Sequence, residues 1–170
     1  IRPETRLVSV MGANNETGVI QPIAELRAIT EQHGIPLHTD SVQILGRIPV
    51  SWQELGVNYA TATAHKLGGP GGIGLLYVRD GSTFTPLITG GKQERVRRAG
   101  TESVALAVGF ASALAWVLEQ QPQLSERLRS FQQQVLKRLQ TVEGFFLNGD
   151  PEFLLPNTLN VGFQGLSAET

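Results

Sequence analysis

Residues 35–43 read Ile-Pro-Leu-His-Thr-Asp-Ser-Val-Gln, and their first part, residues 35–39, is typical of a buried strand followed directly by an acidic residue. Gly34 precedes this strand and is expected to end a helix in which Ile23, Leu26 and Ile29 recur at helical spacing. The other apolar runs in this half that read as strands are residues 7–11, 59–64 and 73–78. Strands and helices in this order predict an α/β fold with a largely parallel sheet.

The second half of the chain has a different pattern. Residues 104–118 are almost wholly apolar and predict a buried helix, which we expect Pro122 to end. Residues 124–139 then show the polar and apolar spacing of an amphipathic helix. The strands expected in this half are residues 145–147 and 158–163.

This change of pattern predicts two structural units with a boundary near Gln121. Residues 1–121 would form part of a larger α/β domain, in which a short helix over residues 51–55 is also expected. Residues 122–170 would begin a smaller α+β domain. The sequence starts directly before a strand and stops at a pattern that usually starts a helix, so it reads as an internal fragment of a longer protein.

Composition argues against several classes of function. The 170 residues include 14 Lys and Arg against 15 Asp and Glu, a net charge of −1, which disfavours nucleic-acid binding or a polybasic membrane surface. No apolar run approaches the roughly 18 residues that a membrane helix needs. Cysteine is absent, which excludes disulfides, thiolate metal ligands and a thiol nucleophile within these residues. His33 and His38 have no second ligand at metal spacing, so we expect no metal site.

Asp40 and Lys66 carry the strongest chemical signal. Each stands at the carboxyl end of an expected strand, the place where open α/β sheets bind ligands. A carboxylate can pair with the pyridinium nitrogen of pyridoxal phosphate, and a lysine amine can bind its aldehyde covalently. The alternative from the pattern alone is a salt bridge beside a glycine-rich turn.

Residues 69–74, Gly-Pro-Gly-Gly-Ile-Gly, match the letters of the dinucleotide-binding pattern G-x-G-x-x-G. That pattern requires a strand before the glycines and a helix after them. Here residues 75–78 read as a strand, and Lys66 precedes the glycines rather than following them as in a phosphate loop. Both nucleotide-binding interpretations therefore fail.

Five segments together resemble the cysteine desulfurases of the NifS/IscS-like group, within the class V aminotransferases. The segments are residues 14–23, 38–43, 64–66, 90–95 and 98–103. The resemblance extends from about Leu7 to at least Phe163. It implies pyridoxal 5′-phosphate as cofactor and the fold of type I pyridoxal-phosphate transferases. Residues 1–121 would then be part of the cofactor-binding large domain, and residues 122–170 the truncated start of the small domain.

The resemblance also implies roles around the cofactor ring. Lys66 resembles the lysine that binds the cofactor and moves the substrate α-proton. Asp40 would pair with the pyridinium nitrogen, and Gln43 would bind the ring hydroxyl. Asn15 resembles the asparagine that faces the ring hydroxyl and the substrate carboxylate.

Three further residues match positions that hold the cofactor phosphate. Thr63 and His65 correspond to two such positions in the same subunit, although serine is common where Thr63 stands. Thr101 resembles the residue that reaches the phosphate of the neighbouring subunit, which implies a homodimer.

The family activity is conversion of L-cysteine to L-alanine, with sulfur passed to an enzyme cysteine as a persulfide for iron–sulfur cluster assembly or other carriers. Expected partners are thus L-cysteine and sulfur-acceptor or scaffold proteins, in the cytoplasm, with neither nucleic acid nor membrane. The nucleophilic cysteine would lie beyond Thr170, so the fragment alone is expected to be inactive. The alternatives are another class V lyase or aminotransferase, or a fragment that only binds partners.

Overall fold

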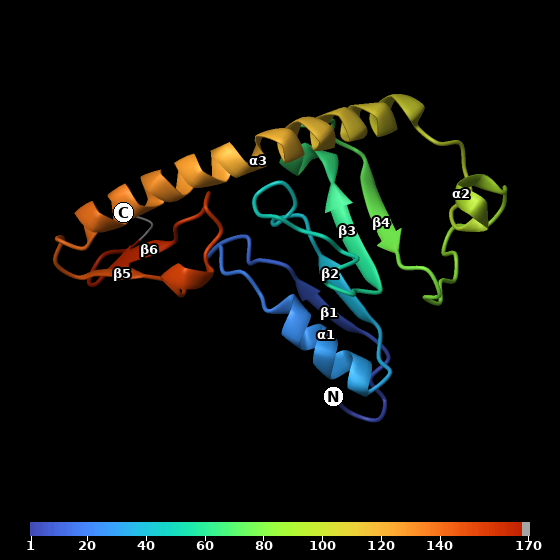
Figure 1. Ribbon diagram of the computed structural model, residues 1–170, viewed down its shortest axis with the longest axis horizontal. Coiled ribbons are helices and arrows are strands. Elements are labelled where there is room, and N and C mark those ends of the chain that lie inside the picture. The colour runs from blue at the N-terminus through green and yellow to red at the C-terminus, as the bar shows by residue number, and fades with distance from the viewer. Residues whose placement is uncertain (168–170) are drawn as a thin grey trace.

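The computed structural model describes residues 1–167. Its main sheet consists of four strands. In order across the sheet, the strands are β1 (Val8–Met11), β2 (Leu37–Asp40), β3 (Tyr59–Thr63) and β4 (Gly74–Val78). The first three are parallel, whereas β4 runs antiparallel to β3 at one edge (Figure 1). The mostly parallel α/β sheet predicted from the sequence is therefore confirmed.

Helix α1 (Ile23–Gln32) connects β1 to β2 and packs against the sheet (Figure 1). The buried residues of this contact are Ile23, Leu37, Val57 and Ala60. Complete burial of a side chain such as Leu37 contributes about 1.5–3 kcal/mol to stability. Gly34, with φ of +64°, follows the helix and ends it as expected, because a left-handed residue cannot continue a right-handed helix.

The two faces of the sheet differ in burial. Side chains alternate between the faces of a strand, and Leu37 and Thr39 on one face of β2 are fully buried. The opposite face is more exposed and mixes polar side chains with Met11 and Leu76. There the His38 ring lies between two hydroxyl groups, with Nδ1 2.8 Å from Ser9 Oγ and Nε2 3.3 Å from Thr61 Oγ1. The expectation of buried strands is thus correct for one face only.

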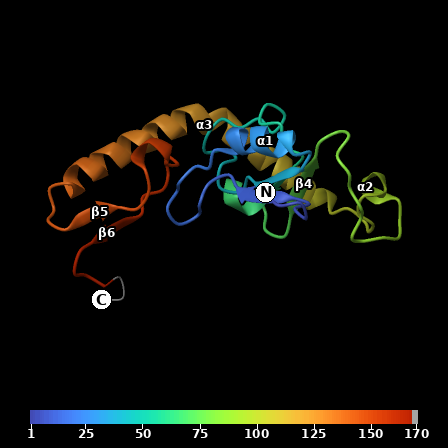
Figure 2. The ribbon, with the colours of Figure 1, turned by 90° about the horizontal axis from the view of Figure 1, so that it is seen from below.

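Helix α3 (Val104–Leu139) is 36 residues long and runs nearly the length of the molecule (Figures 1 and 2). Pro122 lies inside it, so the prediction that this proline ends the helix is wrong. Proline removes one backbone N–H and clashes with the carbonyl four residues earlier, here that of Leu118. Both residues are exposed, so the lost backbone hydrogen bond lies on the outer side of the helix. Gln121 is buried beside the proline and donates to Ser125 Oγ at 3.1 Å, which holds the inner side of the helix in place.

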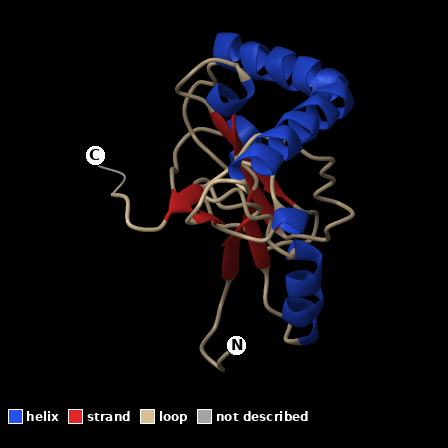
Figure 3. Cartoon of the chain, turned by 90° about the vertical axis from the view of Figure 1, so that its left-hand side faces the viewer, coloured by secondary structure: helices blue, strands red, loops and turns tan. Residues whose placement is uncertain are grey.

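Only a narrow stripe of α3 is buried. Phe110 and Val117 are 5% and 2% exposed and pack near η1 (Ala64–Leu67), the short 3-10 turn that follows β3. Val108 and Trp116 are 59% and 60% exposed, so the expectation that residues 104–118 are core is wrong. The strands lie between α3 and the N-terminus (Figure 3), and the helix crosses the end of the sheet, so few of its side chains reach the core.

By length and composition alone, α3 is the one helix among residues 1–167 that could cross a membrane. Core helices of folded domains meet the same criterion. Phe110 and Val117 of this helix share an apolar cluster with residues of the sheet and of η1. Helix α3 therefore packs onto the folded domain through this stripe, while most of its surface is exposed.

A smaller unit lies beside the second half of α3 (Figure 1). Its strands β5 (Phe145–Leu147) and β6 (Val161–Phe163) form an antiparallel pair, and β6 is shorter than expected. Gln132 on α3 fixes the loop between them, because its amide donates to the carbonyls of Leu155 at 3.1 Å and Thr158 at 2.9 Å.

The smaller unit is also joined to the loop that follows β1. The Ile20 N–H donates to the Phe153 carbonyl at 2.7 Å, and the Leu155 N–H donates to the Gly18 carbonyl at 2.8 Å. A continuous helix therefore crosses the expected boundary near Gln121, and backbone hydrogen bonds connect the two sides. The division into residues 1–121 and 122–170 stays a prediction.

Residues 51–55 contain turns in place of the expected short helix. Ser51 still acts as a cap, because its hydroxyl oxygen accepts the Glu54 N–H at 3.2 Å. Three short elements were not expected from the sequence, namely η1, α2 (Gln93–Val96) and η2 (Pro151–Phe153).

Two valines of α3 test this description of the helix. We expect Val117→Ala to lower the free energy of unfolding by about 2 kcal/mol, because it removes two methyl groups from a buried contact. The matched change Val108→Ala, at an exposed position of the same helix, should cost less than about 0.5 kcal/mol. Urea unfolding followed by circular dichroism gives both values. Equal effects of the two substitutions would contradict the buried stripe.

Candidate functional site

Parallel pairing brings the ends of β1, β2 and β3 to one edge of the sheet. Met11 is paired with Asp40, and Asp40 with Thr61. The pairing continues past the strand ends, where the Gly12 N–H donates to the Asp40 carbonyl at 2.7 Å. The predicted site residues on or just after these strand ends are Asn15, Asp40, Gln43, Thr63, His65 and Lys66. The structure therefore gathers these six at the edge where α/β sheets bind ligands.

Asp40 is the last residue of β2, and its carboxylate is exposed. One oxygen, Oδ1, accepts the Val42 N–H at 2.9 Å, which orients the group. Among residues 1–167 the carboxylate makes no other hydrogen bond and no ion pair. It can therefore still accept a hydrogen bond from a ligand.

His38 lies two residues before Asp40, on the same face of β2. Burial lowers the pKa of the His38 imidazole, and the Asp40 charge opposes that shift. Because the dominant effect disfavours the charged ring, His38 is neutral at neutral pH. It then serves as a polar link between β1 and β3 through Ser9 and Thr61.

Thr63 and His65 form a pair at the end of β3. The Thr63 hydroxyl donates its single proton to the Ile73 carbonyl at 3.1 Å. It must then accept from His65 Nδ1, which lies 2.9 Å away. The His65 side chain is exposed, and its Nε2 makes no hydrogen bond among residues 1–167. The pair therefore presents an ordered polar group beside Lys66.

Lys66 lies in η1, the turn that Gly68 ends with φ of +79°. Its side chain is exposed and makes neither a hydrogen bond nor an ion pair within the part of the chain that the structure describes. The ion pair found in that part joins Arg27 and Glu31 on α1, at 2.7 Å. Asp40 and Lys66 thus form no salt bridge with each other, and the simpler alternative is wrong.

Two amide side chains complete the edge. Asn14 shapes the loop after β1, because its Oδ1 accepts the N–H groups of Glu16 at 2.9 Å and Thr17 at 2.8 Å. The neighbouring Asn15 is exposed and has no side-chain hydrogen bond among residues 1–167, and the amide of Gln43 is likewise unengaged. Both are available to a ligand.

Thr101 lies apart from the other predicted residues. It belongs to the connection between α2 and α3, which extends beyond the edge strand β4 (Figure 1). Its side chain is exposed. A single chain therefore does not bring Thr101 to the site, and its role across a dimer stays a prediction.

Sequence reasoning missed Arg47 near this edge. Its guanidinium donates through Nη2 to the Lys66 carbonyl at 3.1 Å. The available signal was a lone cation inside the apolar stretch Ile-Leu-Gly-Arg-Ile-Pro-Val, residues 44–50. Such a cation needs a polar partner, but the sequence does not show which one.

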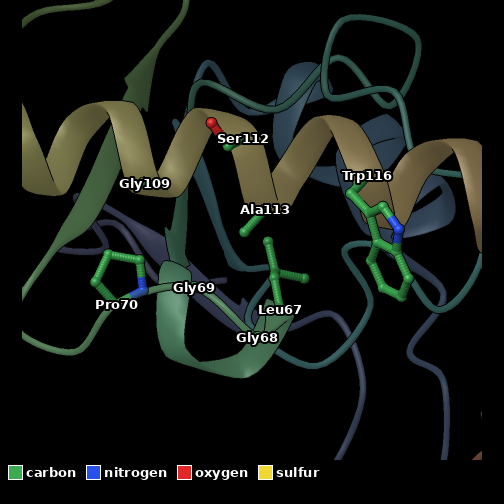
Figure 4. Close-up of a pocket in the computed structure, with 8 residues that line it drawn as sticks. All are labelled: Leu67, Gly68, Gly69, Pro70, Gly109, Ser112, Ala113 and Trp116. Atoms are coloured by element: carbon green, nitrogen blue, oxygen red, sulfur yellow. The ribbon is translucent and has the colours of Figure 1, made fainter.

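The glycine-rich loop leads directly into β4, so the rejection of a dinucleotide site is confirmed. A hollow lies between this loop and α3 (Figure 4). Its lining residues are Leu67, Gly68, Gly69, Pro70, Gly109, Ser112, Ala113 and Trp116. None of the predicted site residues lines it, so it is separate from the polar edge. No group of metal ligands occurs among the described residues.

Known proteins with similar sequences support the same interpretation as the geometry of the site. The model of the aminotransferase class-V family matches residues 1–170. A cysteine desulfurase IscS of Dictyoglomus turgidum is 40% identical over 171 residues, which cover 100% of this chain and 43% of that protein. A cysteine desulfurase NifS of Azotobacter vinelandii is 38% identical over 167 residues, covering 98% and 42%.

Solved structures give a consistent result. A NifS-like protein superposes with a TM-score of 0.90 at 38% identity, covering 98% of this chain and 46% of that one. DndA from Streptomyces lividans superposes with a TM-score of 0.85 at 35% identity, covering 99% and 49%. The chain thus spans less than half the length of these relatives. Since the family model covers every residue, the chain belongs to the class-V aminotransferase family.

Proposed function

We propose that the whole protein is a cysteine desulfurase that uses pyridoxal 5′-phosphate. The observation that carries this proposal is the pair of unengaged charged side chains, Asp40 and Lys66, at the carboxyl ends of the adjacent strands β2 and β3. Class-V aminotransferases and cysteine desulfurases depend on this cofactor. The relatives described above bear the name cysteine desulfurase.

The side chains at the edge fit the chemical groups of the cofactor. Asp40 has a carboxylate oxygen without a partner among the described residues, as a pyridinium N–H requires. Lys66 has a free amine for the aldehyde. Thr63 and His65 are already oriented by their own hydrogen bonds beside Lys66, where they would hold the phosphate. The amides of Asn15 and Gln43 would form hydrogen bonds with the ring hydroxyl.

When bound, pyridoxal phosphate supplies an electron sink for the substrate α-carbon. In this proposal, residues of the chain hold the ring proton, move the substrate proton and orient the substrate. The Asp40 carboxylate would hold a proton at the ring nitrogen, which maintains the sink. Lys66 takes and returns the substrate α-proton at Nζ, as a general base and then a general acid. Asn15 orients the substrate carboxylate.

The sulfur acceptor must come from outside these residues, because the 170 residues contain no cysteine. In the proposed reaction a protein thiolate attacks the sulfur of L-cysteine, the substrate carbon–sulfur bond breaks, and the carbon keeps the electron pair and gains a proton. The products are L-alanine, whose methyl carbon carries the new proton, and a protein persulfide, whose outer sulfur comes from L-cysteine. The sulfur then passes to an acceptor or scaffold protein, such as one of iron–sulfur cluster assembly.

The proposed assembly is a homodimer in the cytoplasm. Its support is the exposed position of Thr101 beyond the edge of the sheet, where it is accessible to a second subunit. In the proposed division, residues 1–121 contribute the cofactor site and residues 122–170 begin the small domain.

The reaction products test the function directly. Full-length protein loaded with pyridoxal phosphate should release equal amounts of alanine and sulfide from L-cysteine in the presence of a thiol reductant. An aminotransferase would instead need an amino acceptor such as a 2-oxo acid and would release no sulfide. Amino-acid analysis and sulfide titration measure both products. Alanine formation without sulfide would refute the desulfurase assignment.

Substitution of Lys66 tests the covalent attachment. We expect Lys66→Ala to remove the visible absorption band of the lysine-bound cofactor, because no other amine lies in η1. The matched control is Lys137→Ala, which changes an exposed lysine in the last turn of α3 and should leave the band intact. An unchanged band in Lys66→Ala would assign the attachment to another residue.

Substitution of Asp40 tests the electron sink. Asp40→Asn keeps the shape and the hydrogen bond from Val42 but removes the negative charge that holds the ring proton. Substrate α-hydrogen exchange with deuterium should slow by about two orders of magnitude or more, while cofactor affinity falls less. Asp80→Asn, an exposed aspartate after β4, is the control. Near-normal exchange in Asp40→Asn would contradict the assigned role.

A further inference from the structure

We propose that Arg47 is a positioning residue for Lys66, and that α3 holds Arg47 in place. The observation is that Arg47 is hydrogen-bonded at both ends: its backbone carbonyl accepts from Ser125 on α3, and its guanidinium donates to the backbone of the reactive lysine. The proposal deepens the proposed function, because it rests on that function for what Lys66 does. Whether Arg47 fixes the position of η1 can be tested independently of the proposed function.

The turn that carries Lys66 has too few backbone donors for its own carbonyls. Element η1 spans four residues, and Gly68 ends it in the left-handed region. The Ala64 carbonyl accepts the N–H groups of Gly68 and Gly69. The Lys66 carbonyl accepts from the Arg47 guanidinium, at 3.1 Å. Carbonyls at the end of a helical turn need such an external donor, so Arg47 completes the turn from a distant loop.

The partners of Arg47 indicate that this bond accounts for its position. The side chain is partly buried, and it forms no ion pair with any carboxylate in residues 1–167. Its one side-chain hydrogen bond in that range is the bond to Lys66. The bond is exposed to solvent, so its role is geometric: a charge-assisted, directional contact links the loop after β2 to the turn of Lys66.

Helix α3 fixes Arg47 from the other side. The Ser125 hydroxyl donates to the Arg47 carbonyl at 2.6 Å, and it accepts from the buried amide of Gln121 at 3.1 Å. Gly46, directly before Arg47, has φ of +71°, and a Cβ there would lie 2.7 Å from Val117 on α3. The loop therefore approaches the helix closely at two consecutive residues. Helix α3 thus holds the backbone of Arg47, and the side chain of Arg47 reaches from there to Lys66.

Hydrogen exchange in cofactor-free, full-length protein tests the placement of the turn. We expect Arg47→Met, which keeps the length of the side chain but removes its donors, to speed exchange in residues 64–70 by at least about tenfold. Arg47→Lys keeps one donor and should restore part of the protection. The matched control is Arg79→Met, because Arg79 Nη1 also donates to a backbone carbonyl, that of Gly56, at 2.9 Å. It should leave residues 64–70 unchanged.

The rate of covalent attachment of pyridoxal phosphate tests the effect on Lys66. The visible band should form about tenfold more slowly in Arg47→Met than in the unchanged protein, with partial rescue in Arg47→Lys and no change in Arg79→Met. Ser125→Ala retains the guanidinium but removes its support from α3, so it should give an intermediate rate. Should Arg47→Met fail to fold, Arg47→Lys and Ser125→Ala decide the question by the same two measurements.

Two results would overturn the proposal. One is that folded Arg47→Met shows unchanged hydrogen exchange in residues 64–70 and an unchanged rate of cofactor attachment. A fall in thermal stability alone would then mean that Arg47 only stabilises the fold. The other is an equal effect of Arg79→Met on residues 64–70. Failure of the unchanged protein to form the visible band would refute the proposed function instead, while the exchange experiment would still decide the role of Arg47.

Discussion

Parallel hydrogen bonding among β1, β2 and β3 is the constraint on which the rest of the structure depends. It places the carboxyl ends of all three strands at one edge, with Asp40 between the loop that carries Asn15 and the turn that carries Lys66. Antiparallel pairing would have sent one of these groups to the opposite end of the sheet. The candidate site is therefore a consequence of strand direction first and of side-chain chemistry second.

Contacts from the second half of the chain then hold the loops at this edge. The Gly18 carbonyl after β1 accepts the N–H of Leu155, and Ser125 on α3 holds the loop after β2 through Arg47. These contacts explain why one helix of 36 residues is present although a proline lies near its middle. Its buried side contacts both units, so shortening it would lose packing on either side of Pro122.

Much of the fold followed from local patterns. The apolar runs predicted the four strands of the sheet because burial and backbone pairing act on short segments, and Gly34 predicted a helix end because its left-handed conformation is a local property. Pro122 and residues 51–55 were predicted wrongly. In both places the local preference was weaker than the tertiary contacts, namely the Ser125 hydroxyl on the Arg47 carbonyl and the Trp52 indole N–H on Ser41 Oγ.

By itself, the sequence determined which side chains could do chemistry and where they stand relative to strands, because Asp40, Thr63 and Lys66 are fixed by their positions along the chain. Only the tertiary structure decided that Asp40 and Lys66 remain unpaired, that the Thr63 hydroxyl donates to the Ile73 carbonyl, and that Arg47 supports the turn of the lysine. The physical reason is that hydrogen bonds between residues distant in sequence depend on the docking of separate elements, and no local pattern records which donors and acceptors will meet.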